Sequence, residues 1–373
     1  MNQSFQNFPG TIIWIAPFYN RSGYGVLARA TVMALHRRGI PVKVIPVDQV
    51  EPGIDDSDMN LIRSLQLTPI IPPVTAIVSH VPNKSWADMS LPEPNIRILS
   101  TTFDSSAQGN VPPSDWLDVF HKMEQIWVQS HKEQEVFVSA GVPPEKVHIV
   151  HFPNPWKDNP VLPPVSPEYT GADKPFRFLS IAMFQPRRRW DVLIESYLEE
   201  FKNGEHVELY LKVNYPPWHP VPGKPKQDLY DLISSLRSKT GSNAPIIIDE
   251  ELGTRKGIVE LIDSANTYVS TDTAPTAPVS EAIVRHRLVI ASLALKMMPR
   301  EYFVGINEDT NVKVPLTPDM LMYQPHHKDA YMPQLKVVQV KRALRRAYTL
   351  TVEGRALCCN GAQRSIPGAD ETI

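Results

Sequence analysis

The chain has 373 residues, of which 42% are hydrophobic and 21% are charged. This is the composition of an ordinary globular protein, and the length favours two domains, because single hydrophobic cores rarely grow that large. The net charge of −2 supplies no overall positive field, so the composition argues against a nucleic-acid-binding protein.

Three features of the sequence favour a cytoplasmic protein. No stretch approaches the ~18 consecutive apolar residues of a membrane span, so we expect no transmembrane segment. The N-terminal segment MNQSFQNFPG lacks the basic region and apolar run of a secretory signal. The two cysteines, Cys358 and Cys359, are adjacent, an arrangement that suits neither a disulfide framework nor a metal site.

The first half of the chain alternates short apolar runs with amphipathic segments. Residues 11–16 (TIIWIA) predict a buried strand, and residues 22–38 predict a helix with apolar positions at helical spacing. Further elements are predicted as strands at 42–47, 74–79, 96–101, 125–129 and 147–152 and as helices at 114–123 and 131–140. Apolar strands separated by helices favour a parallel sheet that is covered on both faces.

A Pro-rich segment without periodicity, residues 154–175, is interpreted as an interdomain linker. The alternating pattern then restarts, with strands predicted at 176–183, 207–213, 245–249, 267–271 and 288–292 and helices at 189–202, 227–239, 255–264 and 279–286. The sequence therefore predicts an α/β protein with two doubly wound, Rossmann-like domains, residues 1–153 and 176–330, which face a central cleft.

The C-terminal part of the sequence is less regular. The stretch REYFVGINEDTNVKVPL, residues 300–316, is compatible with two short strands. The stretch PQLKVVQVKRALRRAYTL, residues 333–350, predicts a terminal basic helix. Residues 353–373 show no period and predict a loosely ordered tail, so we group 331–373 as a terminal helix and tail.

The loop between the first predicted strand and helix, Phe18–Gly25 (FYNRSGYG), is the first candidate binding segment. Gly23 and Gly25 permit a positive φ and a close approach of the backbone to a ligand. The N-terminus of the following helix favours a phosphate group. Both glycines are therefore candidates for phosphate binding, and the alternative is a tight turn capped by Ser22.

The corresponding loop of the second half, QPRRRWD (185–191), carries three arginines in a row. Arg187 and Arg188 are candidates for a clamp on a diphosphate, because guanidinium groups bind phosphate oxygens through two parallel hydrogen bonds. The alternative is a solvated loop, or a set of ion-pair partners for the acidic helix that follows.

The segment STDTAPTAPVSEA (270–282) also leads from a predicted strand into a helix. Pro278 suits the first turn of that helix, where proline is favoured. Glu281 is a candidate hydrogen-bond partner for the hydroxyl groups of a ribose or another sugar. Its alternative role is the ordinary complement of an acidic residue to a helix dipole.

Other polar residues stand at or near the predicted carboxyl ends of strands, where open α/β sheets bind their ligands. In the first half these are His80 and Asp104, both candidate catalytic residues. In the second half Lys212 and Glu250 are candidate contacts to a donor sugar or nucleotide. A structural role for His80 and a solvated position for Glu250 are the alternatives.

Residues 11–292 together resemble the glycosyltransferases of the family 4-like, GT-B type. SGYGVLARATVMALHRRGIPVKVI looks like that family's Gly loop, first helix and second strand. MEQIWVQS and SAGVPPEKVHIV are similar to its motifs D-x-I-W-V-P-S and S-G-V-P-x-x-K-V-x-V-V. FLSIAMFQPRRRWDVLIESYLEEF resembles the start of its second domain, G-R-x-x-P-x-K-x-x-D-x-L-I-x-A-F.

The resemblance implies a nucleotide-sugar donor held by residues 176–330 and a carbohydrate or other hydroxyl acceptor held by residues 1–153. It implies transfer with retention at the anomeric carbon, with the nucleotide sugar as co-substrate and with no metal and no separate cofactor. The family's phosphate-binding lysine falls on Arg188, and the preceding arginine falls on Met183. The candidate catalytic residues are then His80, Asp104, Arg188 and Glu281.

The sequence departs from the family pattern E-G-F-G-L-P-x-x-E-A at the donor loop. Pro278, Glu281 and Ala282 match, but the first glutamate falls on Thr273 and the two glycines fall on Ala274 and Thr276. Asp272 or Thr273 would then meet the donor sugar, together with Pro278 and Glu281. Three functions stay open: an active glycosyltransferase, a degenerate GT-B protein that acts as a binding or partner subunit, and another enzyme of this architecture, such as a sugar-nucleotide epimerase or a phosphorylase.

Overall fold

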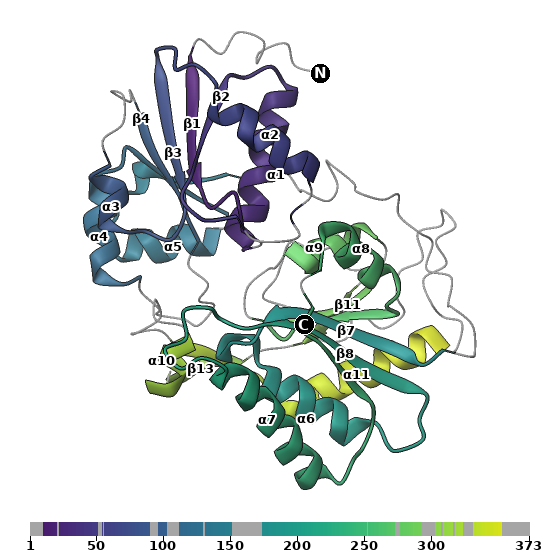
Figure 1. Cartoon of the computed structure of the whole chain (residues 1–373). Coiled ribbons are helices and arrows are strands. Elements are labelled where there is room, and N and C mark those ends of the chain that lie inside the picture. Colours follow the sequence, from purple (N-terminus) through teal and green to yellow (C-terminus); the bar gives the residue numbers. More distant parts are fainter. Residues whose placement is uncertain are drawn as a thin grey trace. The chain divides into compact units, whose positions relative to one another are not determined.

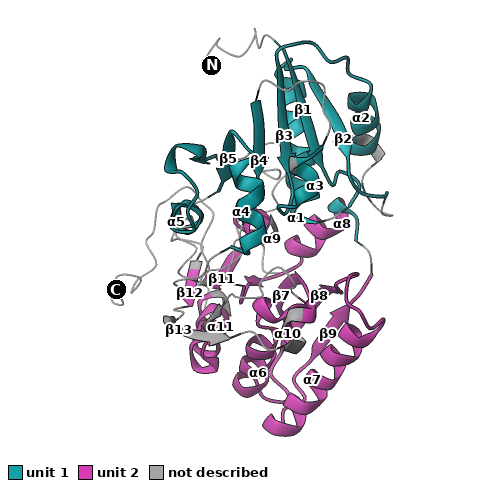
Figure 2. Cartoon of the chain, turned by 90° about the vertical axis from the view of Figure 1, so that its left-hand side faces the viewer, with its two compact units in different colours: residues 1–104, 109–161, 252–255 teal, residues 105–108, 162–251, 256–373 magenta. Residues whose placement is uncertain are grey.

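The computed structural model describes residues 10–20, 22–50, 54, 56–89, 96–102, 112–129, 131–150, 174–251, 253–272, 277–285, 287–292, 303–306, 309–315, 318–323 and 331–352. The chain divides into two compact units, which Figure 2 colours separately. Unit 1 comprises residues 1–104, 109–161 and 252–255, and unit 2 comprises residues 105–108, 162–251 and 256–373.

Unit 1 is built on a six-stranded parallel sheet with the strand order β2-β1-β3-β4-β5-β6. Its strands are β1 (Thr11–Ala16), β2 (Val42–Pro46), β3 (Val74–Ser79), β4 (Ile96–Ser100), β5 (Gln125–Val128) and β6 (Val147–Ile149). Its helices are α1 (Gly23–Arg37), α2 (Asp56–Gln66), α3 (Lys84–Ala87), α4 (Ser114–His121), α5 (His131–Ser139) and the 3₁₀ turn η2 (Pro144–Lys146).

The core of unit 1 forms around β1, whose six residues are all buried. Trp14 of β1 packs with Ala28 and Val32 of α1 and with Ile62 and Leu65 of α2. Figure 1 shows α1 and α2 along one face of this sheet. A strand buried on both faces needs no alternation of polar and apolar side chains, which explains the uninterrupted apolar sequence TIIWIA.

Unit 2 contains a second six-stranded parallel sheet, in the order β12-β11-β10-β7-β8-β9. Its strands are β7 (Phe176–Met183), β8 (Val207–Asn214), β9 (Ile246–Asp249), β10 (Thr267–Val269), β11 (Leu288–Ser292) and β12 (Phe303–Ile306). An antiparallel pair, β13 (Asp309–Pro315) and β14 (Tyr331–Gln334), adds a small separate sheet.

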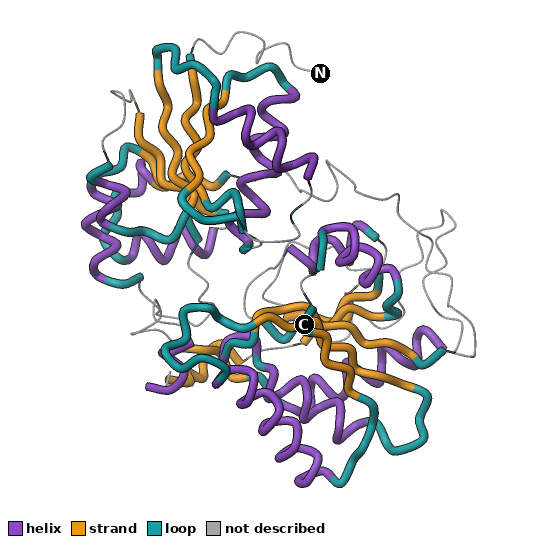
Figure 3. Tube along the Cα trace, in the orientation of Figure 1, coloured by secondary structure: helices purple, strands orange, loops and turns teal. Residues whose placement is uncertain are grey.

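Helices cover both faces of the unit 2 sheet, as the tube in Figure 3 shows. One hydrophobic cluster joins the sheet to helices α6, α7 and α11, and another joins it to α8 and α9. The helices are α6 (Trp190–Glu200), α7 (Lys224–Thr240), α8 (Arg255–Asp263), α9 (Ala277–Val284), α10 (Pro318–Tyr323) and α11 (Val337–Val352), with the 3₁₀ turn η3 (Pro186–Arg188) before α6.

Both sheets are doubly wound, and each has a point at which the strand order reverses. In unit 2 the first strand, β7, lies between its successor β8 and the later strand β10, which gives the common 3-2-1-4-5-6 order. In unit 1 the order is 2-1-3-4-5-6, so the reversal lies between β1 and β3. Ligands of such sheets bind beyond the carboxyl ends of the strands at this reversal point.

The strands and main helices lie where the sequence predicts them, and their ends differ by a few residues. Helix α7 begins at Lys224 rather than at 227, because Pro225 occupies its first turn, where the missing N–H is not needed. Strand β10 ends at Val269 rather than at 271, and beyond it the Thr271 hydroxyl donates to the carbonyl of Arg188.

Several elements escaped prediction, namely helices α2, α3 and α10, the 3₁₀ turns η2 and η3, and strand β14. The two short strands expected in 300–316 and the terminal basic helix are present as β12, β13 and α11. Nearly all of the predicted linker 154–175 and the whole predicted tail 353–373 lie outside the described residues. Within the described part of the chain, no helix is long and apolar enough to cross a membrane.

Candidate functional site

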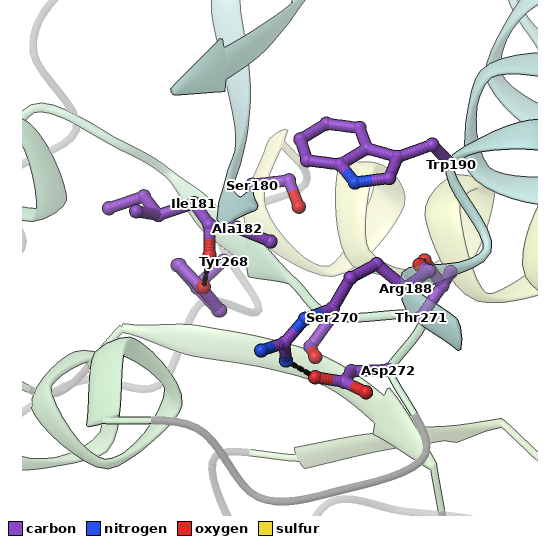
Figure 4. A pocket seen from close by; sticks show the side chains of 9 residues that line it. All are labelled: Ser180, Ile181, Ala182, Arg188, Trp190, Tyr268, Ser270, Thr271 and Asp272. Atoms are coloured by element: carbon purple, nitrogen blue, oxygen red, sulfur yellow. Dashed lines mark hydrogen bonds and ion pairs between the residues drawn. The ribbon is translucent and has the colours of Figure 1, made fainter. Parts of the chain in front are cut away.

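A small pocket opens in unit 2 at the reversal point between β7 and β10, and Figure 4 shows it from close by. Its lining comes from the end of β7, from the turn that leads into α6, and from β10 with the residues that follow it. The lining residues are Ser180, Ile181, Ala182, Arg188, Trp190, Tyr268, Ser270, Thr271 and Asp272. The pocket therefore occupies the position at which a doubly wound sheet binds ligands.

Two arginines and one aspartate form the charged part of this site. Nη1 of Arg187 lies 3.2 Å from Oδ1 of Asp272, and Nη1 of Arg188 contacts Oδ2 of the same carboxylate. Figure 4 shows the Arg188 guanidinium turned toward Asp272. Asp272 is only 2% exposed, and such a buried carboxylate requires ion-pair partners to offset its lost hydration. The three side chains together keep one positive charge in excess.

The turn that carries the arginines is held from both neighbouring strands. The Thr271 hydroxyl donates to the carbonyl of Arg188 at 2.6 Å, and Nε1 of Trp190 donates to the carbonyl of Met183 at 3.2 Å. Arg189, between η3 and α6, adopts the left-handed conformation with φ 51°. This conformation is uncommon outside glycine and ends the 3₁₀ turn before α6 begins.

The structure places Glu281 and Pro278 on α9, where Pro278 is the second residue. Glu281 is 2% exposed and its Oε1 lies 3.6 Å from Nη1 of Arg285, one helical turn further on. Arg285 in turn pairs with Asp263 of α8. Glu281 is not among the described residues that line the pocket, and Thr273 lies outside the described residues.

Lys212 and Glu250 belong to a polar cluster at the carboxyl ends of β8 and β9. Nζ of Lys212 lies 2.6 Å from Oδ1 of Asp249, and the same carboxylate accepts a 2.8 Å hydrogen bond from Tyr210. Burial raises the pKa of Asp249, but the hydrogen bonds from Lys212 and Tyr210 lower it to below its ordinary value. Burial and the Asp249 carboxylate together raise the pKa of Tyr210 to about 12. Lys212 is thereby engaged with Asp249.

Glu250 has a similar environment. It accepts a 2.6 Å hydrogen bond from the hydroxyl of Tyr215 and pairs with Nζ of Lys226 at 2.5 Å. Burial raises the pKa of Glu250, and the hydrogen bonds from Lys226 and Tyr215 outweigh it, so the pKa lies below its usual value. Neither Lys212 nor Glu250 lines the pocket among the described residues.

In unit 1 the two glycines of the first loop lie inside α1. Neither Gly23 nor Gly25 has a positive φ, so the conformational reason for which they were singled out is wrong. A Cβ at Gly25 would lie 2.6 Å from the carbonyl oxygens of Pro17 and Asn20, whereas a Cβ at Gly23 would meet nothing within 4 Å. The absence of a side chain at Gly25 thus allows α1 to pack closely against the loop that precedes it. The Ser22 hydroxyl caps the helix by accepting a hydrogen bond from Gly25 N at 3.1 Å.

His80 lies between two aromatic rings beyond β3. Its ring stacks on Tyr24 with centroids 5.7 Å apart and packs at 5.4 Å against Trp86. The hydroxyl of Tyr24 accepts from the backbone N–H of Thr102 at 3.2 Å, and Nδ1 of His80 lies 3.2 Å from the carbonyl of Val81. This aromatic stack lies at the reversal point between β1 and β3. Asp104 lies outside the described residues.

The sequence did not single out several residues that the fold brings to these two places. In unit 2 they are the pocket residues Ser180, Trp190, Tyr268, Ser270 and Thr271, and in unit 1 they are Tyr24, Trp86 and Glu133. For Ser270 and Thr271 the available signal was their position just after a strand, and the other residues had no signal of this kind. The described residues contain no group of three or more His, Cys, Asp or Glu side chains placed to hold a metal ion.

The sequence matches no known family model, and no curated protein matches it in sequence. Its structure is similar to that of Anabaena Alr3699/HepE in complex with UDP-glucose, at 12% identity and a TM-score of 0.55, over 93% of this chain and 98% of that one. An E. coli trehalose-6-phosphate structure bound with UDP-2-fluoro glucose gives 9% identity and a TM-score of 0.57 over 93% of each chain. A glycosyltransferase from Rickettsia africae ESF-5 gives 12% identity and a TM-score of 0.52, over 91% of this chain and 88% of that one.

At 9–12% identity the structural similarity shows a shared fold and nothing more. The chemistry has to be inferred from the site itself. The predicted fold class is confirmed: the chain has the α/β fold of GT-B glycosyltransferases, with two doubly wound units.

Proposed function

We propose that the protein is a glycosyltransferase that moves a sugar from a nucleotide-sugar donor to a hydroxyl group of a carbohydrate or another acceptor. The observation that carries this proposal is the arginine pair, Arg187 and Arg188, at the reversal point of unit 2. Two of the structurally similar proteins hold UDP-glucose or its 2-fluoro analogue. A nucleotide sugar contains the diphosphate for which paired guanidinium groups are suited.

In this proposal unit 2 binds the donor. Arg188 and Arg187 neutralise the diphosphate as it departs, which lowers the barrier because negative charge develops on the leaving oxygen. Such neutralisation by side chains needs no metal ion, and retention at the anomeric carbon follows the sequence resemblance. The polar cluster of Lys212, Asp249 and Glu250 is proposed to contact the nucleotide or the donor sugar.

Unit 1 is proposed to bind the acceptor. His80, held between Tyr24 and Trp86, offers an imidazole with a fixed ring orientation. Aromatic rings also supply apolar surface on which a sugar ring can pack. Asp104 is proposed to act with His80 on the acceptor hydroxyl, and correct placement of the two reactants would supply much of the rate enhancement.

A second candidate function is a binding or partner subunit without transferase activity. Two observations favour it. Met183 stands where the resembling family has an arginine, which removes one cation from the donor site. Glu281, which matches the family's second glutamate, is buried beside Arg285 instead of lining the described pocket. A protein of this kind would bind a nucleotide and would not release or transfer the sugar.

The test is Arg188→Gln, with Arg177→Gln as the matched control. Arg177 also pairs with a carboxylate, that of Glu208, but it lies near the opposite end of β7. We expect UDP, ADP or GDP to raise the melting temperature of the wild type and of Arg177→Gln. Arg188→Gln should lose this shift, and its turnover of the matching sugar nucleotide should fall by about 10²–10³-fold.

The outcomes separate the two candidate functions. Release or transfer of sugar by the wild type supports the glycosyltransferase, and the anomeric configuration of the product decides retention. A nucleotide-induced shift without turnover of any sugar nucleotide supports the binding subunit. If none of the common nucleotides shifts the wild type, neither function holds at this pocket.

A further inference from the structure

Asp272 contacts the same two arginines, Arg187 and Arg188, that are proposed to bind the diphosphate. Its Oδ1 lies 3.2 Å from Nη1 of Arg187, and its Oδ2 contacts Nη1 of Arg188. Each guanidinium thus meets a different oxygen of one anion. Phosphate oxygens contact arginine side chains in the same way, so carboxylate and diphosphate are alternative partners for this pair.

The two arginines that pair with Asp272 are partly exposed, although the contacting atoms, Nη1 of Arg188 and Oδ2 of Asp272, are buried. Arg188 and Asp272 both line the pocket, and the side chains of Arg187 and Arg188 are 12% and 15% exposed. Unit 2 contains a chemically similar group that is closed. Asp263 pairs with Arg285 and Arg287, whose side chains are only 2% and 4% exposed. Each group thus consists of one aspartate and two arginines, but only the arginines that pair with Asp272 are partly exposed.

We infer that Asp272 is the internal counter-anion of the arginine pair and that an anionic ligand binds by taking over its contacts. This inference rests on the proposed function, in which the arginines receive the donor diphosphate. In the absence of ligand the carboxylate holds both guanidiniums in place and neutralises one of their two charges. It is therefore a positioning residue that also sets selectivity, because only an anion with more than one charge and several oxygens exchanges well with it.

Removal of the carboxylate should make the protein less stable and its affinity for anions higher. Asp272→Asn removes the buried carboxylate that pairs with both Arg187 and Arg188, and we expect the melting temperature to fall by about 5–10 °C. Inorganic pyrophosphate should restore most of this loss, since it replaces the carboxylate. The dissociation constant of pyrophosphate, measured by calorimetry, should be about tenfold or more lower for Asp272→Asn than for the wild type.

Three controls make the result specific. Asp263→Asn should also lower the melting temperature, but pyrophosphate should not restore it, because Arg285 and Arg287 are closed to solvent. The double variant Arg188→Gln/Asp272→Asn should lose the response to pyrophosphate. Sodium chloride at the same ionic strength should not replace pyrophosphate, which excludes simple screening.

The inference is overturned if Asp272→Asn binds pyrophosphate no more tightly than the wild type, or if neither protein binds it. It is also overturned if pyrophosphate does not raise the melting temperature of Asp272→Asn, or if it raises that of Asp263→Asn equally well. Pyrophosphate contains neither nucleotide nor sugar, so its exchange with Asp272 can hold even where no sugar nucleotide is turned over. The converse result is turnover that depends on Arg188 while Asp272→Asn has no effect on pyrophosphate binding. That result would support the proposed function and contradict this inference.

Discussion

Gly23 and Gly25 lie two positions apart at the start of α1 and have opposite surroundings. A Cβ at Gly25 would come within 2.6 Å of two backbone carbonyl oxygens, and a Cβ at Gly23 would meet nothing within 4 Å. The sequence singled out both glycines after the first strand, but the motif could not show which glycine is required for packing or why. That distinction depends on the path of residues 17–20, which no local pattern specifies.

We predict that Gly25→Ala lowers the free energy of unfolding of unit 1 by about 1–3 kcal/mol, because the loop or the helix must shift to admit the methyl group. Gly23→Ala should leave it unchanged or raise it by up to about 1 kcal/mol, since alanine restricts the unfolded chain and suits a helix. Urea unfolding of both variants provides the measurement. Equal effects of the two substitutions would contradict this account of Gly25.

Asp249 makes the stability of unit 2 depend on pH. The hydrogen bonds from Lys212 and Tyr210 hold its pKa below the ordinary value of 3.8, against the opposing effect of burial. In acid the unfolded chain therefore binds a proton that the folded chain still excludes. The contribution of this carboxylate is present above pH 3.8 and is lost as the pH falls through the folded pKa.

We predict that Asp249→Asn costs about 1–3 kcal/mol at neutral pH, because it removes hydrogen bonds to a charged acceptor. As the pH falls, the stabilities of the variant and the wild type should converge. Urea unfolding over a series of pH values tests this. Glu260→Gln is the control, because its exposed ion pair with Lys256 contributes little. Parallel pH profiles for Asp249→Asn and the wild type would show that the carboxylate is not held ionised by the fold.

At the scale of elements, α11 completes the core of unit 2 although it is far from α6 in the sequence. Val340, Ala343, Leu344 and Ala347 are buried in the same cluster as Tyr197 and Phe201. Arg345 adds ion pairs to Glu200 and Glu205 near the end of α6. The terminal helix is thus an integral layer of the unit.

Leu344→Ala should lower the free energy of unfolding of unit 2 by about 2–5 kcal/mol, because a fully buried leucine is removed and a cavity remains. Val338→Ala on the same helix should change it by less than about 0.5 kcal/mol, since Val338 is 47% exposed. Chemical unfolding monitored by circular dichroism compares the two. A small effect of Leu344→Ala would mean that α11 is not required by the unit 2 core.

The sequence predicted the long buried strands well and the short polar elements poorly. Apolar runs such as TIIWIA and FRFLSIAM are easily recognised because their strands are central in the two sheets and contain few polar residues. Helix α2 was missed because its sequence, DSDMNLIRSLQ, is rich in residues of low helix propensity. Among its described residues, the buried apolar side chains are Met59, Ile62 and Leu65. Its formation depends on packing against β2 and α1, which the sequence does not display.

At the scale of the whole molecule, each unit has its own sheet and its own hydrophobic clusters. The cluster around Trp14 belongs to unit 1, and the cluster around Phe178 belongs to unit 2. The change of composition near residue 154 indicated two such units. The partners of the arginines could not be predicted from spacing, because Arg188 and Asp272 are brought together by the pairing of β7 with β10.

Because each unit has its own hydrophobic core, we predict that a destabilising substitution in one unit lowers amide protection in that unit alone. Leu344→Ala should speed hydrogen exchange of amides in β7, β8 and α6 by about tenfold or more, because their protection depends on the stability of unit 2. Amides of β1 and β3 should keep their wild-type exchange rates. Mass spectrometry of the exchanged protein measures both. A comparable loss of protection in β1 would show that the two cores unfold together.

The left-handed conformation of Arg189 has a consequence for protein engineering. The backbone conformation of this residue ends the turn that carries Arg187 and Arg188, so a change at position 189 alters the orientation of these two side chains without changing their charges. Glycine at position 189 would permit the same backbone and many others, and a β-branched residue would resist it. A designer who wishes to reorient the arginine pair, rather than remove it, should therefore vary Arg189, whose guanidinium pairs with Asp191.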